Sequence, residues 1–141
     1  MGAPVTAFTR ISTGPIKIHC AVYEPDVVAV LDPTLLRTVP VTSGIGEEGI
    51  IVINSKDGPR EVRRSLNTEK GTVWTVPAIE IAIKILGLPI TNTAMLGAVA
   101  RATEIISLEN VEKVVKERFR LDIAEKNFAV IKEAYQEAKS E

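Results

Sequence analysis

The sequence has little cysteine, few aromatic residues and almost no net charge. Its single cysteine, Cys20, cannot form an internal disulfide, which favours a reducing environment. The formal net charge of −1 gives no reason to expect a nucleic-acid partner, and no stretch is long and apolar enough to cross a bilayer. Met1–Pro4 lacks the basic start and apolar core of a secretory signal. We therefore expect a cytoplasmic protein.

The apolar content is sufficient for one core. Of the 141 residues, 45% are hydrophobic and 25% are charged. A chain of this size buries about two thirds of its unfolded surface when it folds. We therefore predict a single domain over residues 1–141.

An alternating pattern opens the chain. Apolar and polar residues alternate over 5–11, a turn signal follows at Ser12–Pro15, and the alternation resumes at Ile16 and Ile18. This pattern predicts a hairpin with one half-buried face.

Continuous apolar runs follow, and they are typical of strands that are covered on both sides. They lie at 27–31, 50–53 and 72–76. The first run stops at Asp32–Pro33, a helix cap followed by proline at the first helical position. After the third run, Pro77 opens a predicted helix that continues to Leu86 and is closed by Gly87 and Pro89.

The last third of the chain is predicted to be helical. Ser107 caps one helix, and a final helix follows it. Their apolar stripes are Leu108, Val111, Val114, Val115 and Phe119, and then Ala124, Phe128, Ile131, Tyr135 and Ala138. Strands that alternate with helices predict an α/β fold, a three-layer α/β/α domain with a mixed, largely parallel sheet. The opening hairpin is expected to supply the antiparallel pairing.

The segment from Thr91 to Ala102 is the most informative stretch. Thr91 and Asn92 can cap a helix whose side chains are apolar but small, with Gly97 at its centre. Glycine inside a helix costs roughly 1 kcal/mol relative to alanine, so Gly97 indicates a very close neighbour. A helix-on-sheet contact within the domain and a contact with another subunit explain it equally well.

Two sequence motifs resemble binding sites, but the residues around them argue against binding. Gly44–Gly49 has the spacing of a dinucleotide-binding loop, but it precedes a strand and contains two glutamates that would repel phosphate. We interpret it as a loop. His19 and Cys20 point to opposite faces of a strand, and the sequence has no other histidine or cysteine, so metal binding is not expected.

Three further features have structural explanations. The basic segment Ser55–Gly71 could meet an anionic ligand, but acidic residues dilute it and we expect a solvated connection that begins with a turn at 57–59. Asp32 could be a carboxylate at the end of a strand, yet capping explains its position. Trp74 is expected in the core or at an interface.

These residues provide no catalytic machinery. There is no nucleophile beside a base, no metal set and no phosphate loop, so we assign no catalytic, cofactor-binding or metal-binding residue to this chain. If it serves an enzyme, the chemistry lies on other subunits. The candidates for contact with such a partner are Thr91, Asn92, Met95 and Gly97.

Several segments, in order and over nearly the whole chain, resemble the gamma subunit of pyruvate (2-oxoacid) ferredoxin oxidoreductase. The Gly-Ala-Pro-Val start and the Tyr-Glu-Pro-Asp turn are more similar to the pyruvate and branched-chain members than to the 2-oxoglutarate members. The segments that carry the resemblance are 2–10, 23–26, 31–36, 53–55 and 89–98.

The resemblance implies a structural part in the oxidative decarboxylation of pyruvate with coenzyme A to acetyl-CoA and CO2, with electrons passed to ferredoxin. It also implies alpha, beta and delta partner subunits. Thiamine diphosphate would lie between the alpha and beta subunits, and the iron-sulfur clusters in the beta and delta subunits. The gamma subunit would pack near the mouth through which coenzyme A reaches the active site.

One departure from the family is clear. Its members normally begin with a strand, a glycine-rich loop and a helix before the segment that here follows Met1. Because a sheet without that unit exposes an edge and an apolar face, we expect poor solubility or dimerisation of the isolated chain.

The alternatives differ in class. One is a subunit of a 2-oxoisovalerate (branched-chain 2-oxoacid) ferredoxin oxidoreductase. The other is a stand-alone α/β module that binds a small anionic ligand through Asp32 or the segment Lys56–Arg64.

Overall fold

A four-stranded mixed sheet forms the centre of the molecule. The computed structural model describes residues 2–141. The strands follow one another in chain order, with β1 paired to β2 and β2 to β3 in parallel, and β3 to β4 antiparallel. They are β1 (Val27–Val30), β2 (Ile50–Asn54), β3 (Thr72–Val76) and β4 (Lys139–Ser140).

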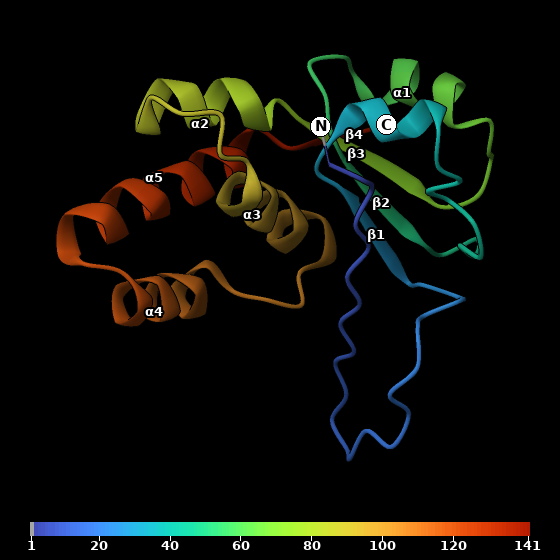
Figure 1. The fold of residues 1–141 in the computed structure, drawn as a ribbon, viewed down its shortest axis with the longest axis horizontal. Helices are drawn as coiled ribbons and strands as arrows, with labels where there is room; N and C mark the ends of the chain where they lie inside the picture. Colours follow the sequence, from blue (N-terminus) through green and yellow to red (C-terminus); the bar gives the residue numbers. More distant parts are fainter. Residues whose placement is uncertain (1) are drawn as a thin grey trace.

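Helices cover both faces of this sheet (Figure 1). On one face lie the short 3-10 helix η1 and helix α1, and on the other lie α2, α3 and α5, with α4 packed outside α5. The helices are η1 (Pro33–Arg37), α1 (Pro59–Leu66), α2 (Ala78–Leu86), α3 (Asn92–Thr103), α4 (Leu108–Arg118) and α5 (Leu121–Glu137). The predicted three-layer α/β fold is confirmed.

The strand β2 divides the core into two halves. Ile51 and Ile53 point towards the cluster under η1 and α1, whereas Val52 points towards α2, α3 and α5. All three side chains are fully buried. Because successive residues of a strand face opposite sides, a continuous apolar run is what a strand between two helical layers requires.

The predicted strand and helix boundaries agree closely with the structure. Gly87 ends α2 in the left-handed conformation, with φ of 74°. The hydroxyl of Ser107 accepts a hydrogen bond from the amide of Asn110 at 3.1 Å, which caps α4 as predicted. Trp74 is half-buried and packs against the α2, α3 and α5 cluster, as expected for a core residue.

The predicted hairpin at the start of the chain is wrong. Residues 2–24, which we call the arm, bend at Thr13–Gly14 but form no strand pairing among the described residues. Figure 1 shows the arm extending away from the sheet and returning to β1. Alternation specifies which side chains share a face, but nothing in the described part of the chain covers that face. The antiparallel pairing comes instead from β4.

The segment 55–71 also differs from its prediction. It contains helix α1 in place of a solvated connection. Gly58 is the N-cap residue, Pro59 occupies the first turn, and Val62 is the one buried side chain of the helix. One buried apolar residue in a polar segment gives no helical periodicity, so the sequence pattern did not predict this helix.

Candidate subunit interface

The predicted contact residues lie at the start of α3. Thr91 is the N-cap residue, but its side chain makes no capping hydrogen bond; its carbonyl accepts from the amide of Met95 at 2.9 Å. The side-chain oxygen of Asn92 accepts from the amide of Thr93 at 2.9 Å. Thr91 is half-buried and Asn92 is exposed. Both remain accessible to a partner.

Met95 and Gly97 lie inside the molecule. The Met95 side chain is buried in the cluster between the sheet and α5. A Cβ atom added to Gly97 would lie 2.2 Å from the carbonyl oxygen of Ile131, on α5. The close neighbour predicted at Gly97 is therefore the backbone of another helix of this chain, and the contact is helix on helix.

Apolar side chains beside Asn92 escaped the sequence analysis. Leu88 and Ile90, in the connection between α2 and α3, and Leu96, one helical turn after Asn92, are exposed. The signal was present, since two large apolar residues stand in a short connection. Gly87 and Pro89 of that connection predict only the end of α2.

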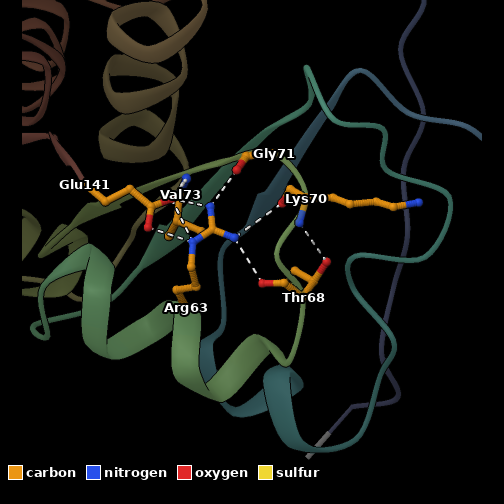
Figure 2. Close-up of polar contacts among 6 residues, drawn as sticks. All are labelled: Arg63, Thr68, Lys70, Gly71, Val73 and Glu141. Carbon is orange, nitrogen blue, oxygen red and sulfur yellow. Dashed lines mark hydrogen bonds and ion pairs between the residues drawn. The ribbon is translucent and has the colours of Figure 1, made fainter.

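The most connected polar group is Arg63, on α1 (Figure 2). Its Nε donates to both carboxylate oxygens of Glu141 at 2.8 and 2.6 Å, and its other nitrogens donate to the carbonyls of Thr68 at 3.0 Å and Gly71 at 2.5 Å. The amide of Val73 also donates to Glu141, at 3.1 Å. This network fastens α1 and the residues around β4 to the beginning of β3.

The charges of this pair support each other. The hydrogen bond from Arg63 lowers the pKa of the Glu141 carboxyl, although partial burial opposes the shift. The same hydrogen bond raises the pKa of the Arg63 guanidinium, so the pair stays charged. Because Arg63 is already neutralised by Glu141, it has little charge to offer a ligand.

A shallow basic hollow lies beside this network. Its volume is about 390 Å³, and its lining residues are Arg60, Arg63, Arg64, Asn67, Thr68 and Glu69. Arg60 and Arg64 are exposed and lie one turn apart on α1. An anion could be attracted here, which is the one structural feature that favours the ligand-binding alternative.

Asp32 caps a helix, as its position predicted. Its carboxylate accepts from the amide of Thr34 at 2.9 Å and from the hydroxyl of Thr34 at 2.7 Å. The bond from this hydroxyl lowers the pKa of Asp32 most, followed by the amide bond. The carboxylate is thus engaged locally and does not join the basic hollow.

The remaining candidates form no further site. Gly44–Gly49 is a loop before β2, and a Cβ on Gly44 would lie 1.9 Å from the carbonyl of Tyr23 at the end of the arm. Within residues 2–141, no three His, Cys, Asp or Glu side chains gather as metal ligands would, and His19 and Cys20 are both exposed. In the same residues, no helix has the length and apolarity to cross a membrane.

Comparison with known proteins gives consistent matches. The "Pyruvate/ketoisovalerate oxidoreductases common subunit gamma" of Pyrococcus furiosus is 50% identical over 135 residues, which are 96% of this chain and 73% of that protein. The "Pyruvate synthase subunit PorC" of Methanocaldococcus jannaschii is 43% identical over 136 residues, which are 96% of this chain and 72% of that protein.

Solved structures agree with the fold. The crystal structure of pyruvate oxidoreductase subunit PORC from Thermotoga maritima matches with a TM-score of 0.78 and 34% identity, and the match covers 84% of this chain and 66% of that one. The keto/oxoacid ferredoxin oxidoreductase gamma subunit from Geobacter sulfurreducens has a TM-score of 0.61 at 19% identity, which supports the fold alone.

The family described as pyruvate ferredoxin/flavodoxin oxidoreductase matches residues 1–137, nearly the whole chain. The identity to the curated relatives and the match to the solved structure lead to the same result. This chain belongs to the pyruvate ferredoxin/flavodoxin oxidoreductase family.

Proposed function

We propose that this chain is the gamma subunit of a pyruvate ferredoxin oxidoreductase complex. The observation that carries the proposal is 50% identity, over 96% of the chain, to a protein named as the common gamma subunit of pyruvate and ketoisovalerate oxidoreductases. The complex would oxidatively decarboxylate pyruvate with coenzyme A, giving acetyl-CoA and CO2 and reducing ferredoxin. This chain would contribute structure rather than reactive groups.

The residues of this chain do not fit an iron-sulfur cluster. Such a cluster is held by about four thiolates, and the sequence has one cysteine, Cys20, which is exposed. The glycine loop at 44–49 leads into β2 rather than into a helix, so it lacks the helix N-terminus that a phosphate site uses. We therefore assign the thiamine diphosphate and the clusters of the complex to the alpha, beta and delta subunits.

The preferred 2-oxoacid is pyruvate in this proposal. The relative from Methanocaldococcus jannaschii is named a pyruvate synthase subunit. The relative from Pyrococcus furiosus is named a common subunit of pyruvate and ketoisovalerate oxidoreductases, so its name covers two substrates. A subunit shared between two such enzymes would not select the substrate. A branched-chain 2-oxoacid oxidoreductase therefore remains the closest alternative, and the partner subunits would distinguish the two.

The subunit contact is proposed at the start of α3. Asn92 is exposed there, Thr91 is half-buried, and the exposed apolar side chains of Leu88, Ile90 and Leu96 adjoin them. Apolar side chains with a polar rim are the usual composition of such contacts. We also propose that Thr91 and Asn92 contact a partner subunit and that the complex is cytoplasmic.

Co-purification tests the proposal. The chain is tagged and expressed with the neighbouring subunits, and the eluate is assayed for pyruvate-dependent, coenzyme A-dependent reduction of ferredoxin. We expect large partners that carry iron and thiamine diphosphate. A chain that elutes alone, and that binds inorganic pyrophosphate in a way abolished by Arg60→Ala with Arg64→Ala, would instead favour the ligand-binding module.

A further inference from the structure

The arm carries a group of exposed large apolar side chains. Val5 is 86% exposed, Ile11 69% and Ile18 61%. The other large apolar residues exposed along the arm are Phe8, Ile16 and Tyr23. A group of large apolar side chains in water marks a surface on which another molecule packs.

The two limbs of the arm are held together by one side chain. The guanidinium of Arg10 donates to the carbonyl of Cys20 at 2.6 Å and to that of Ala21 at 3.1 Å. The limbs share no backbone ladder, so their amides and carbonyls stay available, apart from the Cys20 and Ala21 carbonyls that Arg10 binds. An extended segment that is ordered before binding loses less conformational entropy when it binds.

The arm also has a charge of its own. It contains two basic residues, Arg10 and Lys17, and one acidic residue, Glu24 at its end, so its net charge is +1. The rest of the chain has 15 lysines and arginines against 17 acidic residues, a net charge of −2. A surface that receives the arm would be apolar and would carry carboxylates.

We propose that the arm docks, as an extended segment, on a partner subunit of the oxidoreductase. The proposal rests on the function proposed above. The partner would offer an apolar groove beside an unpaired strand edge, with carboxylates placed to meet Lys17 and Arg10. Main-chain hydrogen bonds would supply affinity, and pockets for Phe8 and Ile18 would supply specificity.

A second copy of this chain fits the arm less well. Two arms lying against each other would bring like charges together. The free edge of β1 is four residues long, whereas the first alternating limb spans residues 5–11. An edge that short leaves much of the limb unpaired.

Hydrogen exchange on the assembled complex tests the proposal. We expect arm amides in residues 5–11 and 16–22 to exchange about tenfold or more slowly in the complex than in the isolated chain at low concentration. Equally fast exchange in both would overturn the proposal. Equal protection that disappears on dilution would assign the arm to a second copy, and equal protection that persists would assign it to this chain alone; both also overturn it.

A pair of variants locates the effect. Phe8→Asp should lower the yield of partner subunits recovered with the chain, whereas Ile83→Asp on α2 should not, since Phe8 and Ile83 are both 50% exposed. Equal recovery for Phe8→Asp and the wild type would count against arm docking. If the wild-type chain recovers no partner at all, the proposed function fails, and that result is distinct from a complex whose arm stays unprotected.

Discussion

The guanidinium of Arg63 and the carboxylate of Glu141 form an ion pair between residues 78 positions apart. Arg63 lies on α1, and Glu141 follows β4. Both side chains are mostly shielded from water, so the attraction is screened less than at an open surface. The pair joins two elements that no stretch of local sequence connects.

Replacing Glu141 with glutamine should destabilise the chain by about 1–2 kcal/mol near neutral pH. The substitution removes the charge that Arg63 binds and weakens the bond from the Val73 amide. Urea titration of the free energy of unfolding measures the loss. Glu125→Gln, at an exposed position, is the control and should change stability little.

The same pair predicts how stability depends on pH. Arg63 lowers the pKa of Glu141 in the folded chain, so the unfolded chain takes up this proton more readily. The stability that this ion pair contributes is complete above the ordinary glutamate pKa. It is lost as pH falls through the lower pKa that Glu141 has in the folded chain. The difference between wild type and Glu141→Gln should therefore shrink from pH 7 to about pH 3. A difference that stayed constant would contradict the pairing.

Gly97→Ala should destabilise the fold, although alanine is the better helix former. The added methyl would meet the Ile131 carbonyl at 2.2 Å, and backbone on both helices would have to move. Overpacking costs about 1–3 kcal/mol, which outweighs the gain of roughly 1 kcal/mol in helix propensity. Thermal unfolding measures the result. Gly46→Ala, where a methyl would meet open space, is the control.

Replacing Asn54 with leucine should lower the free energy of unfolding by about 2–4 kcal/mol. Its amide donates to the carbonyl of Leu31 at 2.9 Å, and its oxygen accepts from the amide of Ala78 at 3.1 Å. Leucine would leave both groups without these partners near the buried end of β2. Chemical denaturation checks this, with exposed Asn110→Leu as the control. A loss no larger than that of the control would show that water replaces both bonds.

Asn92→Lys should weaken assembly while leaving the unfolding midpoint close to that of the wild type. Asn92 is exposed in the first turn of α3, so lysine has room but would disturb a partner surface. Quantitative co-purification of partner subunits is the measurement. Asn110→Lys, in the first turn of α4, is the matched control. Recovery equal to wild type would remove the start of α3 from the interface.

The sequence pattern predicted the strands that are marked by continuous apolar runs. The apolar runs at 50–53 and 72–76 were sufficient to place β2 and β3. Helix α1 was missed because only Val62 of its eight residues is buried. The two residues of β4 carry no signature, since pairing with Trp74 and Thr75 defines them.

The site shows the same division. A close neighbour for Gly97 was predictable, because glycine is costly in a helix. Its identity was not, because the partner, Ile131, lies on another helix and tertiary packing brings the two together. Alternation in the arm predicted a hairpin with a half-buried face, which is wrong: a ladder needs a second strand in register, the described chain supplies none, and the apolar side chains of the arm are exposed.

The position of β4 has a consequence for folding speed. Strands β1, β2 and β3 meet their neighbours in chain order, so their contacts close short loops, whereas Val73 and Glu141 are 68 positions apart. Closing a longer loop costs more entropy, and contacts of high order slow folding. The parallel unit should thus collapse first. Trp74, the one tryptophan, is in register with Val52 in this unit and with Ser140 of β4, so its surroundings change in both steps.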